Sequence, residues 1–298
     1  MKIWMLLKNP ENYNINRFKE EAKKQETILE TVSAEDFDII ATKEGRKSIY
    51  LGGKEIEELP DVLIPRMGSG TTYFALAVIR HLENLGVLVL NKAESIELAK
   101  DKLASLQHLA KHNLPIPKTM LAKFPFNMEI IKKEFSFPII IKTLSGSLGK
   151  GVFLCDKKSS LENVMDLIES SKDSAKNFIF QEFISGSKGR DIRVIVIGGR
   201  PIGAMLREAK KGSFRANFSA GGKVSNFELN PAVAWLAVES AKLTSLDIAG
   251  VDILFDGENY YVCEVNSAPG FEGFEKATGV NVPKMIFDYI DVRKFGSE

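Results

Sequence analysis

Short apolar runs alternate with amphipathic segments over residues 1–93. The runs "KIWMLL", "DVLIPR" and "VLVLN" are typical of buried strands, and "FDIIAT" and "SIYLGG" predict shorter ones. The segment "TYFALAVIRHLENLG" has apolar positions at helical spacing and ends at a glycine. Strands that alternate with helices predict an N-terminal α/β domain over this range.

Residues 94–184 form a second predicted unit. A helix is expected to begin at Ser95, with Glu97 in its first turn, and to end at the prolines of "HNLPIP". The strand "FPIIIK", a glycine loop and the strand "GVFLC" follow. The helix "SLENVMDLIES" and the strand "NFIFQEFI" complete the unit.

Residues 185–298 form a third predicted unit with two hairpins. "DIRVIVIGGRPIGAMLRE" turns at Gly198–Gly199, and "GVDILFDGENYYVCEVN" turns near Asp256–Gly257. Between them, Asn230–Pro231 supplies a cap and a first-turn proline for a helix. The helix "VPKMIFDYI" closes the chain, and no internal repeat or long linker separates the units.

Composition narrows the classes of partner. The 298 residues are 44% hydrophobic and 27% charged, which is ordinary for a globular protein, and a formal charge of +1 gives no bulk attraction to nucleic acid or anionic membranes. The apolar stretch in "MKIWMLLKNP" is too short for a secretion signal, and no stretch has the length of a membrane span. Cys155 and Cys263 lie outside any metal-binding pattern. We therefore expect a cytoplasmic protein with reduced cysteines.

Acidic and amide side chains end the last predicted strand. Glu264 and Asn266 are two residues apart, so they should share a face with Val262, while Cys263 and Val265 point the other way. Carboxylate and amide oxygens are ligands that Mg²⁺ prefers. An odd-length turn or a bulge would place Asp252 of the partner strand opposite Glu264, whereas an even turn would place it on the other face. An edge strand with a solvated polar face is the alternative interpretation.

The segment "IIIKTLSGSLGKGV" places Lys142 at a strand end, before a loop with Gly146, Gly149 and Gly151. Glycine-rich backbone and a lysine favour phosphate binding. The loop is not a P-loop, because Gly151 rather than Ser or Thr follows Lys150, and the strand after it excludes the Rossmann fingerprint. The pattern predicts a lid over a nucleotide triphosphate, with an ordinary hairpin loop as the alternative.

Cationic residues gather in the third unit, namely Arg193, Arg207, Lys210, Lys211 and Arg215. Arg207 ends an apolar strand, and Arg215 precedes Asn217 in a loop flanked by glycines. These positions favour anion binding, although such charge runs are often only solvated surface. In "FIFQEFI", Gln181–Glu182 interrupts an apolar strand and could present backbone groups to an adenine edge.

The order of these motifs resembles the ATP-grasp superfamily. More closely, "IPRMG", "REAKKGSFRANFSAGG", "AGVDIL" and "EVNSAPGFEGFEKATGVNV" resemble the RimK-type amino-acid ligases over nearly the whole chain. The resemblance implies an α/β (α+β) ATP-grasp fold: a Rossmann-like N-terminal domain (1–93), a central lid domain (94–184) and a C-terminal grasp domain (185–298). One departure is the turn "NSAPG", in which Ala and Ser are exchanged relative to the ribosomal-protein ligase of this family.

The resemblance also implies a reaction. An acceptor carboxylate attacks the γ-phosphate of ATP to give an acyl phosphate and ADP, and the amine of an amino acid then displaces phosphate. Glutamate is the expected amino acid, and the acceptor is a protein or peptide C-terminus or a small molecule. ATP and two Mg²⁺ ions are expected, with Mn²⁺ as a substitute, in a homo-oligomer (dimer or tetramer). The alternatives are a ligase for another amino acid and a small-molecule or carrier-protein carboxylate, or a regulator that binds ATP without ligating.

Position by position, the resemblance assigns the nucleotide contacts. It implies that Lys102 and Lys142 contact the ATP phosphates and that Asp191 lies near the ribose. The adenine is expected to meet the backbone of Glu182, Phe183 and Ile184. A second nucleotide-contacting stretch is Arg215, Ala216 and Asn217.

The resemblance assigns the metal and the substrates as well. The expected Mg²⁺ ligands are Asp252, Glu264 and Asn266. Arg207 should stabilise charge on the transferring phosphoryl group and contact substrate, so Arg207→Ala should reduce turnover strongly with little effect on folding. Arg66 and the turn from Ser267 to Gly270 are the candidates for holding a substrate carboxylate.

Overall fold

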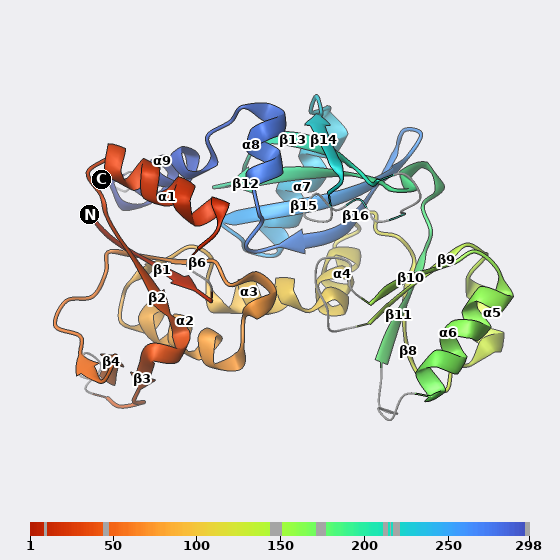
Figure 1. The fold of residues 1–298 in the computed structure, drawn as a ribbon, viewed down its shortest axis with the longest axis horizontal. Helices are drawn as coiled ribbons and strands as arrows, with labels where there is room; N and C mark the ends of the chain where they lie inside the picture. The colour runs from red at the N-terminus through yellow and green to blue at the C-terminus, as the bar shows by residue number, and fades with distance from the viewer. Residues whose placement is uncertain are drawn as a thin grey trace.

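The computed structural model describes residues 1–8, 11–43, 48–143, 151–170, 177–210, 214, 216 and 221–295. Its helices and strands form three parts, seen in Figure 1 as an N-terminal part in red and orange, a green part, and a part in teal and blue. The mixed helix and sheet content agrees with the expected α/β (α+β) fold. None of the described helices combines the length and the apolar character needed to cross a membrane.

The N-terminal part is built on a parallel sheet. Its strand order is β2-β1-β6-β7, with Ile3 of β1 paired to both Leu29 and Val62. Parallel strands bring their carboxyl ends to one edge, where open α/β sheets bind ligands. The elements of this part are β1 (Lys2–Leu7), α1 (Tyr13–Lys24), β2 (Ile28–Ser33), η1 (Ala34–Asp36), β3 (Phe37–Ile39), β4 (Ile49–Leu51), β5 (Lys54–Glu55), β6 (Val62–Pro65), η3 (Gly68–Gly70), α2 (Tyr73–Asn84) and β7 (Leu88–Val89).

Two helices replace the single one expected from Ser95. Helix α3 (Ala93–Lys100) begins two residues earlier, and α4 (Lys102–Lys111) follows a break at Asp101. Asp101 has extended backbone angles, and its carboxylate accepts hydrogen bonds from the N–H groups of Leu103 and Ala104. The carboxylate therefore caps a new helix rather than lying inside a continuous one.

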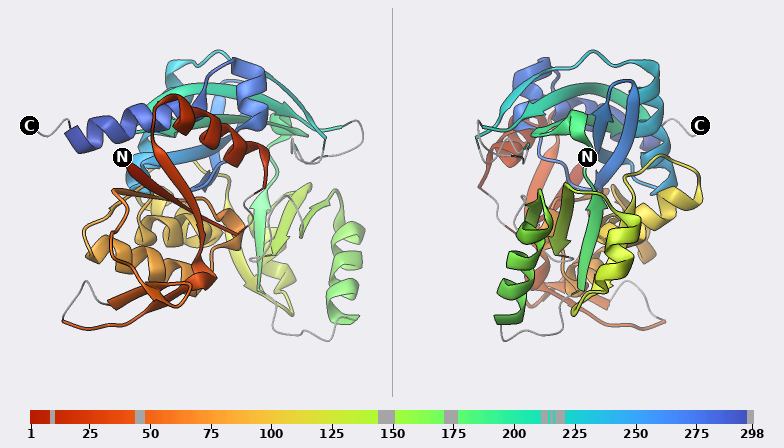
Figure 2. Two further views of the ribbon diagram at one scale, coloured as in Figure 1. Left: turned by 60° about the vertical axis from the view of Figure 1, so that its left-hand side comes forward. Right: turned by 90° about the vertical axis from the view of Figure 1, so that its right-hand side faces the viewer.

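The green part is an antiparallel sheet with the order β10-β9-β11-β8. A separate cluster of buried side chains, with Phe126 packed edge-on against both Phe178 and Phe180, forms its core. Figures 1 and 2 show this part standing apart from the rest of the molecule. Its elements are β8 (Thr119–Lys123), α5 (Met128–Glu134), β9 (Ile139–Thr143), β10 (Val152–Cys155), α6 (Lys158–Ser170) and β11 (Asn177–Glu182).

The third part is an antiparallel sheet with the order β14-β13-β12-β15-β16. Both predicted hairpins are present, and Gly198 and Gly199 have φ values of +57° and +74°, which glycine adopts readily. Helix α7 begins after Asn230, as expected. The elements are η4 (Ser185–Ser187), β12 (Arg190–Ile197), β13 (Arg200–Glu208), β14 (Lys223–Asn226), α7 (Pro231–Leu243), β15 (Ile248–Asp256), β16 (Asn259–Asn266), α8 (Glu272–Thr278) and α9 (Val282–Phe295).

One hydrophobic cluster joins the first and third parts. It contains Met5 of β1 and Phe18 of α1 together with Ile195 of β12 and Phe287 of α9. Asp61 adds a polar link, because its carboxylate accepts from the backbone N–H of Lys2 (2.7 Å) and Nζ of Lys294 (2.6 Å). The division at residues 93 and 184 stays a proposal, since Ala93 and Ile96 pack in the core of the N-terminal part.

Candidate functional site

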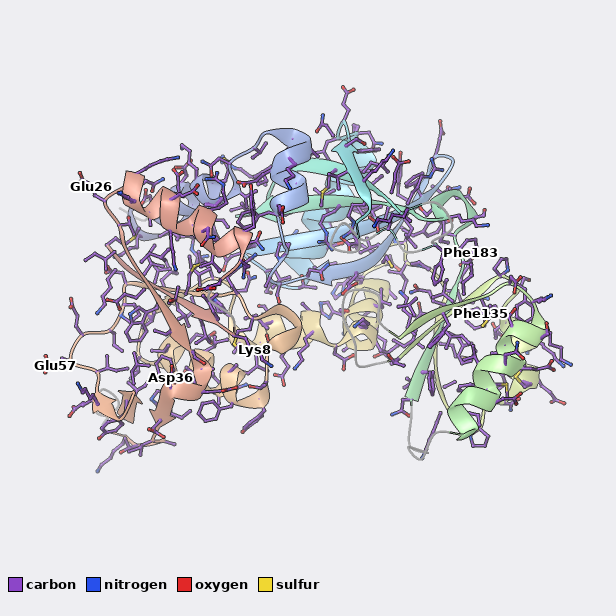
Figure 3. All side chains as sticks on the ribbon, in the orientation of Figure 1. Lys8, Glu26, Asp36, Glu57, Phe135 and Phe183 are labelled. Carbon is purple, nitrogen blue, oxygen red and sulfur yellow. The ribbon has the colours of Figure 1, made fainter. Side chains whose placement is uncertain are left out.

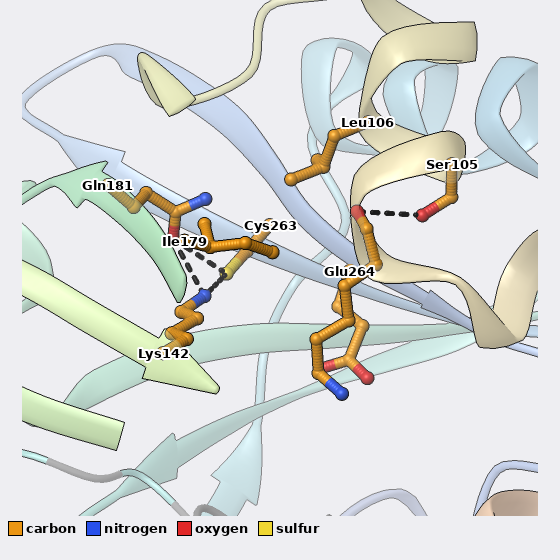
Figure 4. Close-up of a pocket in the computed structure, with 8 residues that line it drawn as sticks. Ser105, Leu106, Lys142, Ile179, Gln181, Cys263 and Glu264 are labelled. Atoms are coloured by element: carbon orange, nitrogen blue, oxygen red, sulfur yellow. Dashed lines mark hydrogen bonds between the residues drawn. The ribbon is translucent and has the colours of Figure 1, made fainter. Parts of the chain in front are cut away.

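Three predicted ligand-binding residues from separate elements line one pocket. Lys102 begins α4, Lys142 lies on β9 and Glu264 lies on β16. The pocket therefore lies where the green part meets the third part, and α4 covers one side (Figure 4). Its lining residues are Lys102, Ser105, Leu106, Lys142, Ile179, Gln181, Cys263 and Glu264.

The ammonium group of Lys142 is held by neutral partners. Its Nζ donates to Oε1 of Gln181 at 2.7 Å and lies 3.7 Å from Sγ of Cys263 (Figure 4). Gln181 is fixed in turn, because its Nε2 donates to Oγ1 of Thr119 at 3.0 Å. Neutral partners orient the lysine without offsetting its charge, so the pocket keeps a positive centre suited to phosphate. No pattern in the sequence predicted that Gln181 and Cys263 lie beside Lys142.

A β-bulge sets which side chains of β16 face this pocket. Asp252 pairs with Glu264, but the next pair is Ile253 with Val262, so Cys263 has no partner across the strands. The predicted alternation along β16 is therefore wrong: Val262 packs with Val265 in the core, and Cys263 lines the pocket with Glu264. The sequence left open whether Asp252 lies opposite Glu264. It does, because of a bulge and not because of an odd-length turn.

A buried network of two arginines and two aspartates crosses strands β13, β12 and β15. Arg193 donates to both oxygens of Asp252 at 2.6 and 2.7 Å, and Arg207 donates to both oxygens of Asp191 at 2.5 and 2.8 Å. Nη2 of Arg207 also lies 2.8 Å from Oδ2 of Asp252. Asp191, expected near a ribose, is thus the partner of the arginine expected near the phosphoryl group.

The network shifts the pKa values of its members. Burial alone would raise the pKa of Asp252, but the charges of Arg193 and Arg207 outweigh burial and lower it to about 2. Burial opposes the charge of Arg207, yet Asp252 and Asp191 raise its pKa above the ordinary value. Since Arg207 is only 7% exposed and compensates the buried Asp252 and the partly buried Asp191, its removal should affect folding. The expectation that Arg207→Ala leaves folding nearly unchanged is therefore revised.

Glu264 and Asn266 bring further oxygens close to Asp252, whose own two oxygens are already bound by Arg193 and Arg207. Asn266 donates through Nδ2 to the carbonyl of Gly250 at 3.2 Å, which turns its amide oxygen away from that carbonyl. Glu264 lies opposite Asp252 and lines the pocket. In the described ranges no group of three His, Cys, Asp or Glu side chains is preformed as a metal site. A cation here would therefore combine carboxylate and amide oxygens with oxygens of a ligand, as Mg²⁺ does at phosphates.

The expected adenine segment follows strand β11. The N–H of Glu182 already donates to the carbonyl of Lys118 at 2.9 Å, and the carbonyl of Ile184 accepts from the N–H of Ser187 at 3.1 Å. Phe183 lies at the junction of the green part and the third part (Figure 3). Among the described residues the N–H of Ile184 has no backbone acceptor, so it is the better candidate for a base contact.

The turn from Ser267 to Gly270 is anchored from the N-terminal part. Asn91, which is 1% exposed, donates through Nδ2 to the carbonyls of Ser267 (2.8 Å) and Ile248 (2.7 Å). Nη2 of Arg66 donates to the carbonyl of Pro269 at 2.6 Å. Arg66 and the turn, two sequence-predicted substrate contacts, thus meet directly. Asn91 was missed, and its only signal was a polar residue ending the apolar run "VLVLN".

Several sequence predictions lie outside the described residues. These are Arg215, Asn217, Lys211 and the glycine loop from 144 to 150 with Gly146, Gly149 and Lys150. Ala216 is described as a partly buried residue without regular structure.

Comparisons with known proteins match nearly the whole chain. Residues 1–96 match the RimK pre-ATP-grasp domain and residues 99–290 the RimK-like ATP-grasp domain. A probable alpha-L-glutamate ligase of Legionella pneumophila (strain Corby) is 38% identical over 98% of this chain and 95% of its own, and one from Pseudomonas fluorescens is 37% identical over the same shares.

Solved structures show the same fold. The ATP-grasp ligase PsnB in complex with a minimal precursor has a TM-score of 0.75 at 20% identity and covers 98% of both chains. The same ligase with Mg, ADP and a phosphomimetic variant of the precursor has a TM-score of 0.74 at 19% identity, over 96% of this chain and 97% of that one. D-alanine--D-alanine ligase from Bacillus anthracis has a TM-score of 0.67 at 16% identity over both full chains.

Proposed function

Since this chain belongs to the RimK-type ATP-grasp family and is an ATP-dependent ligase that forms carbon–nitrogen bonds, we propose that it joins an acceptor carboxylate to the α-amine of glutamate. The curated relatives named as probable alpha-L-glutamate ligases support the amino acid. The acceptor we propose is the C-terminus of a peptide or protein; the precursor peptide bound to the structurally similar PsnB supports a peptide as substrate, and the C-terminus is our own proposal.

The observation that carries the proposal is the pocket shared by Lys102, Lys142 and Glu264. Two lysines supply positive charge for phosphates, and Glu264 supplies a carboxylate that would hold a divalent cation. We propose Asp252, Glu264 and Asn266 as the Mg²⁺ ligands, with two ions and Mn²⁺ as a substitute. When bound, Mg²⁺ would act as a Lewis acid that neutralises charge on the phosphate oxygens.

The proposed reaction has two steps. The acceptor carboxylate attacks the γ-phosphorus of ATP, so an acyl phosphate forms and ADP leaves. The amine of glutamate then attacks the acyl carbon, phosphate leaves, and the nitrogen loses a proton. Phosphoryl transfer depends mainly on positioning and charge neutralisation. Lys102 and Lys142 are proposed to hold the phosphates, and Arg207 to stabilise charge on the transferring group.

The remaining site assignments are also proposals. Nucleotide contacts beyond the phosphates are assigned to the backbone of Glu182, Phe183 and Ile184, to Asp191 near the ribose, and to the stretch Arg215, Ala216 and Asn217. Since Asp191 is bound to Arg207, we propose that it acts on the ribose only if that pair opens. Substrate contacts are assigned to Arg207, Arg66, Ser267 and Gly270. The expected homo-oligomer stays a prediction.

The experiment is an ADP-release assay with all amino acids, each against peptides that end in glutamate, with products identified by mass spectrometry. The proposal predicts fast ADP release only when a peptide and glutamate are both present, and a product heavier by one glutamate residue. A different amino acid in the product, or a small-molecule or carrier-protein acceptor, would favour the alternative ligase. Nucleotide binding without ADP release under any condition would contradict the proposal.

A further inference from the structure

Arg66 lies at the carboxyl edge of the N-terminal sheet, and its guanidinium lies close to two aromatic rings. Its backbone N–H donates to the carbonyl of Leu6 at 2.9 Å, which continues the pairing of β6 with β1. The guanidinium lies 6.0 Å from the ring centre of Phe18 and 5.7 Å from that of Phe271. Nη2 donates to the carbonyl of Pro269. Residues from β6, α1 and the turn after β16 therefore fix its orientation.

The other terminal nitrogen of this guanidinium has no partner. Nη1 of Arg66 is a buried side-chain nitrogen without a hydrogen bond, and it alone has this status among the described residues. No carboxylate in the described part of the chain forms an ion pair with Arg66, and burial, with no neighbouring charge to oppose it, lowers its pKa to about 10. The group is still charged at neutral pH. A buried cation with an unused donor destabilises a fold unless an anion completes it.

The surroundings favour an anion brought by a ligand. Lys8 directly follows β1 at the same sheet edge, is exposed, and packs its side chain against Gly70, where a Cβ would lie 3.1 Å from Cδ of Lys8. Figure 3 shows Lys8 near the centre of the molecule. The edge next to Arg66 thus carries a second cation, and such edges bind ligands in open α/β sheets.

The position of Arg66 separates it from the reacting centre. Pro269, whose carbonyl Arg66 binds, packs on Gly250 so closely that a Cβ there would lie 2.5 Å from Cβ of Pro269. Asp252 lies two residues further along β15, roughly 6–7 Å on an extended strand. A carboxylate held by Nη1 of Arg66 would therefore be a different group from the one activated near Asp252 and Glu264.

We propose that Arg66 binds a carboxylate of the incoming amino acid that does not react. This inference rests on the proposed ligase function and deepens it by assigning a residue to the choice of amino acid. The carboxylate can be the α-carboxylate or the side-chain carboxylate of glutamate, since both present the same chemistry to a guanidinium. Binding would give a partner to the one buried side-chain donor among the described residues that has none, on a guanidinium that already links the N-terminal part to the turn after β16.

The test compares the wild type with Arg66→Met, which removes the charge but keeps an apolar stem between the two phenylalanine rings. KM for glutamate and for ATP is measured by ADP release with a fixed acceptor, and urea unfolding is measured without ligands. We expect KM for glutamate to rise at least about 30-fold, as expected for leaving a buried carboxylate unpaired. KM for ATP should change less than about twofold, and the ligand-free variant should be at least as stable as the wild type, because it loses an uncompensated charge.

Substrate analogues identify the carboxylate. Glutamine lacks the side-chain carboxylate, and the α-amide of glutamic acid lacks the other. The ratio of kcat/KM between wild type and Arg66→Met should collapse toward one for the analogue that lacks the carboxylate bound by Arg66. The same large ratio for glutamate and both analogues would overturn the inference, as would an unchanged KM for glutamate in Arg66→Met.

Arg66→Lys covers the case in which Arg66→Met does not fold. A lysine keeps the charge but cannot reach both the carbonyl of Pro269 and a ligand in the fork geometry of arginine. A raised KM for glutamate with an unchanged KM for ATP would support the inference, and a normal KM for glutamate would overturn it. Failure of the proposed function is distinct, because the wild type itself would then release no ADP with any amino acid.

Discussion

Arg193 and Arg207 show why residue type alone did not reveal how the charges of this site are arranged. The sequence identified Arg207, Asp191 and Asp252 as separate ligand contacts, yet the structure joins them and adds Arg193. Arg193 was noted only as a member of a cationic set, because its pairing with Asp252 depends on β12 lying beside β15. Strand order is a property of the fold, and no local pattern encodes it.

Arg207→Ala should reduce both activity and stability. Loss of a positioned donor to the transferring group should lower turnover about 100- to 1,000-fold. Asp191 and Asp252 would lose a buried partner, so the free energy of unfolding should fall by about 3–5 kcal/mol. ADP release and urea unfolding measure the two effects. Arg200→Ala, which removes an exposed arginine on the same strand, is the control and should change neither. Normal turnover in folded Arg207→Ala would refute its catalytic assignment.

Asp252 should make stability depend on acid pH. An unfolded aspartate titrates near a pKa of about 3.9. In the folded chain Arg193 and Arg207 lower the pKa of Asp252 to about 2, so the ionised group stabilises the fold above about pH 4 and this contribution is lost as the pH falls toward 2. The difference in unfolding free energy between wild type and Asp252→Asn should therefore be largest above pH 4 and shrink below it.

Urea unfolding between pH 2 and 7 measures this difference. The control is Asp38→Asn, which changes an exposed residue of β3. A difference that stays constant with pH would contradict it.

At the scale of elements, the bulge in β16 decides which residues reach the pocket. The two residues between Asp256 and Asn259 make an even turn, and by simple alternation an even turn puts Asp252 and Glu264 on opposite faces. The extra residue Cys263 restores their pairing. Packing of Val262 and Val265 into one core accompanies this shift, and the alternation seen in the sequence cannot reveal it.

Cys263 should be protected from alkylation by nucleotide. It lines the pocket beside Lys142, whereas Cys155 has no exposed surface. Burial raises the pKa of Cys263, so its reaction should be slow without ligand. With ADP and Mg²⁺ at saturation, we expect the rate of iodoacetamide labelling at Cys263, followed by peptide mass spectrometry, to fall several-fold. Cys155 is the internal control and should stay unlabelled. An unchanged rate at saturating nucleotide would place the nucleotide elsewhere.

Turns and caps with strong local chemistry were predictable, and long-range anchors were not. Asn230–Pro231 begins a helix and Gly198–Gly199 makes a hairpin because their backbone preferences act locally. Asp101 was predictable only in part. Its side chain is a typical helix cap, but the leucines on both sides of it, from Leu98 to Leu109, also fit one continuous helix. Asn91 and Arg66 bind carbonyls more than 150 residues away, and only the assembled fold brings those carbonyls near.

At the scale of the whole molecule, the N-terminal part and the third part share one hydrophobic core, and the green part has a core of its own. The cluster with Met5, Phe18, Ile195 and Phe287 ties the N-terminal part to the third part, while Phe126, Phe178 and Phe180 belong to a cluster confined to the green part. Among the described residues, one polar contact from the green part to the third part is that from Nζ of Lys142 to Sγ of Cys263. The two cores should therefore unfold separately.

Hydrogen exchange should reveal this division. Amides of β8, β9 and β11 should exchange through an opening that needs less free energy than exchange of β1 and β12, since the green part has the smaller core. Because the pocket has walls on both sides of the junction, ADP with Mg²⁺ should slow exchange in β9 and β11 and leave β2 unchanged. Peptide-resolved mass spectrometry measures both. Equal protection of β1, β9 and β12 would mean that the molecule opens as one unit. Slowing by nucleotide confined to β2 would mean that nucleotide binds at the N-terminal sheet.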